Sequence, residues 1–225
     1  MPRPSSSSPE QTRHHLTVPR TARYLTLGSP VGAREVWFVC HGYGQLAADF
    51  LRGFGPAAAP DRLIVAPEGL SRFYHDQGRG PVGASWMTRE DRDQEITDYV
   101  RYLDLLYERV FSELDRDGAH CTAFGFSQGV ATVARWAVHG RSRMDTLVVW
   151  AGGFPPEIDL VQTAPVWQRL RMVFVAGARD RIVAPDVVAR QQQRFLEAGY
   201  SADFHRFDGG HRLDRAVLSR LATPR

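Results

Sequence analysis

The chain has 225 residues, of which 43% are hydrophobic and 24% are charged, a balance typical of a globular protein with one sizeable core. No apolar run approaches the roughly 20 residues that a membrane helix needs, so we expect no membrane span. All 28 basic residues are arginine, which excludes a Schiff base on a lysine and the lysine of a phosphate-binding loop.

The formal net charge of +3 is modest and the arginines are spread along the chain, so we expect no nucleic-acid partner. Residues 1–20 are rich in Pro, Ser and Arg and contain no apolar block that could serve as a secretory signal. We expect these residues to form a disordered tail, residues 21–225 to form a single domain, and the protein to be cytoplasmic. Cys40 and Cys121 lie in apolar runs and are expected to be free thiols of the core.

From residue 24 onward, short apolar runs alternate with longer segments of helical periodicity. The expected strands are Tyr24–Gly28 at an edge, then Glu35–Cys40, Arg62–Ala66, Cys121–Phe126, Thr146–Ala151, Met172–Ala176 and Ala202–Phe207. The expected helices are Arg89–Leu114 with Thr88 as a cap, Gln128–His139, Pro185–Ala198 and Arg212–Leu221. This alternation predicts an α/β fold with a mostly parallel sheet and helices on both faces.

A G-x-S-x-G pattern at Gly125, Ser127 and Gly129 follows an expected strand and precedes an expected helix. A tight turn between strand and helix exposes a serine hydroxyl, and the glycines keep side chains out of the crowded turn. The helix N-terminus brings its dipole and free N–H groups to the same point. The alternative is a glycine-rich turn whose serine caps a helix.

A serine hydroxyl needs a base to remove its proton, and His211 follows the last expected strand in F-D-G-G-H. Asp180 follows the preceding strand and is the expected acid, which would hold the imidazole in one tautomer. Asp208 is the rival acid, but its place beside the base is more typical of a turn residue. The other histidines lie in the tail or at unsuitable positions.

An oxyanion hole needs two N–H donors. Gln128, the residue after the serine, would supply one, and the H-G-Y-G loop after an early strand would supply the other from Tyr43 or, alternatively, Gly44. His41 begins this loop, where we expect it to hold the loop by hydrogen bonds rather than to act as a base.

The motifs H-G-Y-G, G-F-S-Q-G, G-A-R-D and G-G-H, in this order, resemble the α/β-hydrolase superfamily. They are most similar to its branch of small carboxylesterases, phospholipases and acyl-protein thioesterases. The resemblance runs from about Tyr24 to Leu221, with Val130 where the branch often has a second glycine. It implies Ser127, Asp180 and His211 as the catalytic triad.

These residues predict a serine hydrolase that cleaves an ester or thioester of a small molecule through an acyl-enzyme. The alternatives are a catalytically silent binding protein with the same fold, and a serine hydrolase of another class, such as a lactonase or peptidase. The histidines lack paired metal-ligand spacing and no G-x-G-x-x-G follows a strand, so we expect neither a metal nor a cofactor. The natural substrate and the oligomeric state remain open.

Two segments are expected to border the substrate cleft. The connection between residues 152 and 170 is too short for a lid domain, and its Phe154 could form one wall. The glycine-rich stretch between residues 68 and 88 is expected to be a long loop whose Phe73, Tyr74 and Trp86 form the other wall. The alternative is that these aromatic side chains only fill the space beneath the loop.

Overall fold

The computed structural model describes residues 11–76 and 78–223. A seven-stranded sheet forms its centre, with the strands in the order β1-β3-β2-β6-β7-β8-β9. The strands are β1 (Tyr24–Leu27), β2 (Glu35–Cys40), β3 (Arg62–Pro67), β6 (His120–Phe126), β7 (Thr146–Trp150), β8 (Arg171–Gly177) and β9 (Ala202–Phe207). Six strands run parallel, and β1 pairs antiparallel with β3 at one edge. The mostly parallel α/β sheet and its edge strand are confirmed.

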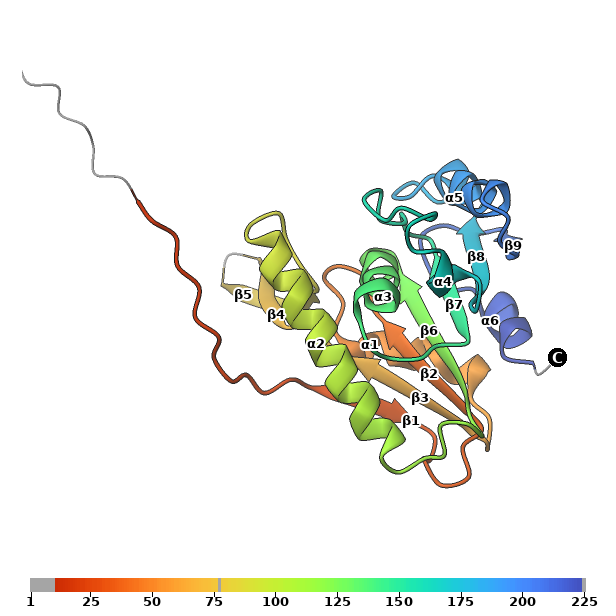
Figure 1. Cartoon of the computed structure of the whole chain (residues 1–225), viewed down its shortest axis with the longest axis horizontal. Coiled ribbons are helices and arrows are strands. Elements are labelled where there is room, and N and C mark those ends of the chain that lie inside the picture. Colours follow the sequence, from red (N-terminus) through yellow and green to blue (C-terminus); the bar gives the residue numbers. More distant parts are fainter. Residues whose placement is uncertain (1–10, 77, 224–225) are drawn as a thin grey trace, which may run out of the picture.

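Helices cover both faces of the sheet, because the central strands are apolar on both sides. One face packs against α2 (Arg92–Phe111), α3 (Gln128–His139), α4 (Ala164–Trp167) and α5 (Pro185–Glu197). The other packs against α1 (Ala47–Leu51), the 3₁₀ helix η1 (Arg52–Ala57) and α6 (Arg215–Leu221). Figure 1 shows α2 as the longest helix, lying along the sheet beside α3. Cys40 and Cys121 are free and buried in this core, as predicted.

The stretch between residues 68 and 88 differs from the expected loop, because it forms an antiparallel hairpin. Strands β4 (Ser71–Asp76) and β5 (Arg79–Ser85) pair with each other in a separate two-stranded sheet. The start of α2 also differs from the expectation. The residue before the helix is Asp91 at φ 53°, and the side chain of Glu95 binds Thr88, so Thr88 does not cap the helix.

Residues 11–20 lie outside the sheet (Figure 1). Of the expected tail, residues 1–10 fall outside the described residues, and residues 11–20 are exposed and contain no helix or strand. The elements from β1 to α6 build one sheet and its helical layers, which supports the proposal of a single domain over residues 21–225. No helix among the residues that the structure describes has the length and apolarity required to cross a membrane.

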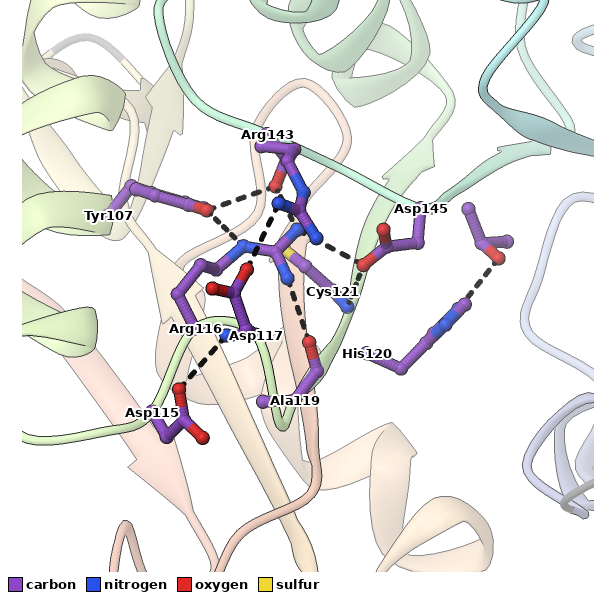
Figure 2. A network of polar contacts seen from close by, with 10 residues as sticks. Tyr107, Asp115, Arg116, Asp117, Ala119, His120, Cys121, Arg143 and Asp145 are labelled. Carbon is purple, nitrogen blue, oxygen red and sulfur yellow. Dashed lines mark hydrogen bonds and ion pairs between the residues drawn. The ribbon is translucent and has the colours of Figure 1, made fainter.

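Arg116 joins three segments at the end of the sheet where β6 and β7 begin (Figure 2). Its guanidinium donates to the hydroxyl of Tyr107, to the carbonyl of Ala119 at 2.8 Å and to the carbonyl of Arg143 at 2.8 Å. It also pairs with Asp145 at 3.1 Å, and that carboxylate accepts the N–H of Cys121 at 2.7 Å. Arg116 therefore ties the connection after α2 to the loop before β7.

We expect Arg116→Met to lower the free energy of unfolding by about 2–3 kcal/mol, because it leaves a carboxylate and two carbonyls without their cation. The matched control is Arg109→Met on α2, which removes an exposed pair with Glu113 just beyond the helix and should cost less than about 1 kcal/mol. Urea denaturation followed by circular dichroism measures both values. Equal losses in the two variants would contradict a special role for Arg116.

Candidate active site

Ser127 lies in the turn between β6 and α3, where the backbone is strained. Its φ is 54°, in the left-handed region that residues with a side chain seldom occupy. The Ser127 N–H donates to the carbonyl of Trp150 at 2.9 Å, which holds the turn against the end of β7. The serine therefore sits at the N-terminus of α3, the positive end of the helix dipole.

The glycines on either side of Ser127 occupy positions where no side chain fits. A Cβ on Gly129 would lie 2.1 Å from the carbonyl oxygen of Cys40, and one on Gly125 would lie 2.5 Å from the carbonyl oxygen of Gly129. The loop after β2 also approaches the turn, because a Cβ on Gly42 would lie 3.2 Å from the Cβ of Ser127. The G-x-S-x-G pattern thus allows α3 to begin directly against the end of β2.

His211 and Asp180 are brought together by the loops after β9 and β8. The N–H of Arg179 donates to the carbonyl of Gly209 at 2.8 Å, which joins the two loops. The Nδ1 of His211 donates to Oδ2 of Asp180 at 2.8 Å, and both side chains are largely buried. The other oxygen of Asp180 accepts the N–H groups of Ile182 and Val183, at 2.8 and 3.0 Å. The carboxylate is therefore fixed on both sides.

Asp208, the rival acid, is exposed and pairs with Arg179 at 2.7 Å. His211, the expected base, lies beside the serine turn, because the ring of Phe126 packs on that of His211 with 4.9 Å between centroids. Within residues 11–76 and 78–223, no hydrogen bond joins the hydroxyl of Ser127 to His211. In serine hydrolases without bound substrate, the hydrogen bond between the serine and its base is often long.

The backbone N–H groups of Tyr43 and Gln128 have no acceptor among the described residues. Gln128 is the first residue of α3, so its N–H belongs to the unpaired first turn of the helix. The N–H of Gly44 donates to the carbonyl of Ala84 at 2.9 Å and is therefore occupied. This favours Tyr43 over Gly44 as the expected second N–H donor of an oxyanion hole.

His41 is buried and holds its own loop, as the sequence predicted. Its Nδ1 donates to the carbonyl of Gly42 at 2.8 Å, and its Nε2 accepts the N–H of Gly69 at 3.0 Å. Burial lowers the pKa of His41, which agrees with a neutral ring whose two nitrogens are both engaged. The ring has no nitrogen left for catalysis.

Glu68 is a buried residue near the site that the sequence analysis did not single out. Burial alone would raise the pKa of Glu68, but Arg23, Arg72 and the N–H of Ala47 bind the carboxylate and hold its pKa below the usual range. Glu68 thereby ties β3 to the start of α1 and to β4. The only signal in the sequence is a carboxylate directly after a buried strand.

The expected substrate walls differ from the structure at two positions. Trp86 and Phe154 are only 2% and 3% exposed, so they fill the core and do not form walls of an open cleft. Phe154 packs against Trp167 and Phe195. Phe73 and Tyr74 lie on the hairpin, where Phe73 stacks on Tyr43 at 5.1 Å and Tyr74 is 55% exposed. These two residues keep the predicted role as a proposal.

Two cavities lie away from Ser127. One of about 480 Å³ lies on the α2 side and is lined by residues such as Val100 and Arg141. The other, of about 350 Å³, lies where the strands begin and is lined by residues such as Thr122 and Thr146. No group of three or more His, Cys, Asp or Glu side chains that could hold a metal ion occurs in the described part of the chain.

Solved structures with the same fold include acyl-protein thioesterase 2 from Zea mays, with a TM-score of 0.69 and 16% identity over 90% of this chain and 96% of that one. The Bacillus cereus carboxylesterase has a TM-score of 0.66 and 15% identity over 89% and 92%. SOBER1 from Arabidopsis thaliana has a TM-score of 0.66 and 16% identity over 84% and 96%. No family model and no curated protein sequence matches the chain.

The chain therefore has the α/β-hydrolase fold that the motifs predicted. At these identities the likeness establishes the fold alone. The connection from residue 151 to 170, all of which the structure describes, contains only the four-residue helix α4, so no lid domain is inserted there. This agrees with the expectation for that segment.

We expect Gly129→Ala to destabilise the protein by about 1–3 kcal/mol, because the added methyl group must push α3 away from the end of β2. Gly153→Ala is the matched control, since a Cβ there meets nothing within 4 Å. Thermal unfolding of both variants tests this. A neutral Gly129→Ala would mean that α3 does not pack as closely as described.

Proposed function

We propose that this protein hydrolyses carboxylic esters or thioesters through an acyl-enzyme formed on Ser127. The observation that carries the proposal is the 2.8 Å hydrogen bond between His211 and Asp180, formed beside a serine in a left-handed turn. The fold neighbours named as a thioesterase and a carboxylesterase support ester or thioester substrates.

In the proposed reaction, the hydroxyl oxygen of Ser127 attacks the acyl carbon while Nε2 of His211 takes the hydroxyl proton. Asp180 accepts the hydrogen bond from Nδ1, which keeps Nε2 free for this step and stabilises the cation that forms. His211 then passes the proton to the leaving group. A water molecule, activated by the same imidazole, hydrolyses the acyl-enzyme and restores the serine.

The negative charge on the acyl oxygen would be bound by the N–H groups of Tyr43 and Gln128. Each such donor typically contributes about 100–1000-fold to turnover, because it is already aimed at the site where charge develops. Tyr43 is itself 60% exposed and stacks on Phe73, which brings apolar surface next to this donor. We propose that Phe73 and Tyr74 contact the acyl or leaving group.

A binding protein without catalysis is the alternative from another class. Pocket binding alone would not require a carboxylate to orient a histidine beside a serine. A lactonase or peptidase would use the same residues on a different acyl compound. A panel of acyl esters, thioesters, lactones and peptides separates these substrates.

We expect a fluorophosphonate to label the wild-type protein and not Ser127→Ala, because the reagent bonds to an activated serine hydroxyl. Ester turnover in Ser127→Ala should fall on the order of a million-fold, which is close to background. Ser201→Ala, at the exposed turn before β9, is the control and should keep full labelling. Absence of labelling in the wild type, or equal labelling of Ser127→Ala, would overturn the proposal.

We expect Asp180→Asn to lower kcat by about 10,000-fold while the protein stays folded, because the amide favours the wrong imidazole tautomer. Asp208→Asn should leave kcat within about threefold, since Asp208 pairs with Arg179 at the surface. Steady-state kinetics on one soluble ester measure both. The reverse ranking would identify Asp208 as the acid.

A further inference from the structure

The end of β5 and the two residues after it, Ala84–Met87, lie between the loop that follows β2 and the start of α3. On the loop side, this segment pairs with the backbone just after Tyr43. The N–H of Gly44 donates to the carbonyl of Ala84 at 2.9 Å, and the N–H of Ala84 donates to the carbonyl of Gln45 at 3.2 Å. The loop is thus fixed to the segment on the C-terminal side of Tyr43.

On the helix side, the segment is bound by the side chain of Gln128. Its Oε1 accepts the N–H of Trp86 at 3.1 Å. Its Nε2 donates to the carbonyl of Met87 at 2.8 Å and to the hydroxyl of Ser85 at 3.1 Å. A single carboxamide therefore satisfies backbone groups of two consecutive residues, and this fixes the direction of the segment as well as its distance from α3.

Trp86 makes a third connection, back to the residues before Tyr43. Its indole N–H donates to the carbonyl of His41 at 2.9 Å, and the two rings lie 5.0 Å apart. His41 in turn binds the carbonyl of Gly42. The loop is consequently held on both sides of Tyr43 by hydrogen bonds to Ala84–Met87. The same segment is bonded to the side chain of Gln128, so these bonds connect the Tyr43 loop to α3.

We propose that the carboxamide of Gln128 and the indole of Trp86 are positioning groups that set the distance between the N–H of Tyr43 and the N–H of Gln128. This inference rests on the proposed function, in which those two N–H groups bind the oxyanion. Donors act best when they lie about 2.7–3.1 Å from the developing charge, so a small displacement of the Tyr43 loop reduces turnover strongly. Gln128 thus acts twice, once through its backbone and once through its side chain.

The test compares Gln128→Met and Trp86→Phe with matched controls that remove similar hydrogen bonds elsewhere. Gln128→Met keeps the length of the side chain and loses the amide. Gln192→Met is its control, because Gln192 binds the carbonyl of Ala202 on β9. Trp86→Phe keeps a buried ring and loses the indole N–H. Its control is Trp167→Phe, because the buried Trp167 donates to Thr163.

Each variant is assayed with an ester and with the thionoester in which sulfur replaces the carbonyl oxygen. Sulfur accepts hydrogen bonds weakly, so turnover of the thionoester depends less on the two donors. For Gln128→Met we expect kcat on the ester to fall about 10–100-fold with KM within about threefold, and the ester-to-thionoester ratio of kcat to shrink. Trp86→Phe should change in the same direction by a smaller factor, and both controls should keep the wild-type ratio.

A merely structural role would lower the activity on both substrates together, so an unchanged ratio in Gln128→Met and Trp86→Phe overturns the proposal. Hydrogen exchange at the amides of Gly44 and Ala84 gives a readout that does not need activity. We expect exchange there to be at least several-fold faster in Gln128→Met than in Gln192→Met. If the proposed function is wrong, the fluorophosphonate does not label the wild-type protein. Unchanged hydrogen exchange at Gly44 and Ala84 in Gln128→Met overturns the positioning role whether or not the wild type is labelled.

Discussion

The approach of α3 to the end of β2 at Gly129 is the contact on which the geometry of the site depends. With no side chain at this position, the first turn of the helix lies against the final carbonyls of β2, and Ser127 must adopt a left-handed φ to make the turn. Strain of this kind costs about 1–3 kcal/mol and persists only when the surroundings hold it. Here the core on both faces of the sheet and the bond from Ser127 to Trp150 supply that restraint.

Two groups of polar residues lie at opposite ends of the sheet. Where the parallel strands end, the loops after β2, β6, β8 and β9 carry Tyr43, Ser127, Asp180 and His211, and the last two bind each other. Where the strands begin, Arg116 joins loops to each other through hydrogen bonds and an ion pair. Polar clusters at the two ends of the sheet therefore have different roles. Only their three-dimensional arrangement distinguishes a candidate site from a cluster that holds loops in place.

Sequence patterns located the parts of this protein that depend on local burial. The run of β2 was predicted with its observed bounds, because a strand buried on both faces is apolar nearly throughout. The bounds of β9 were also predicted correctly, although this edge strand is only partly buried and carries Asp203, His205 and Arg206. The hairpin β4–β5 was missed because glycines and Pro81 interrupt the pattern of β5, and because the hairpin is fixed by the Tyr43 loop and by Gln128. Trp86 was expected to border the substrate cleft because it is an aromatic residue in a glycine-rich stretch. In the structure its indole N–H binds the carbonyl of His41. Asp180 and His211 were inferred from strand order, and their contact is present in the structure; a hydrogen bond from Ser127 to His211 is not formed there.

The β4–β5 hairpin combines two regions under different constraints. Its root at Ala84–Met87 is bound to the loop and to α3, whereas the outer strand carries Tyr74 into solvent and Phe73 against the exposed ring of Tyr43. Substitutions at Phe73 or Tyr74 can change the surface beside Tyr43 without removing a hydrogen bond of the root. Under the proposed function, selectivity for the acyl group is therefore free to diverge over evolution by changes at these two positions, while Ser127, Asp180 and His211 are retained.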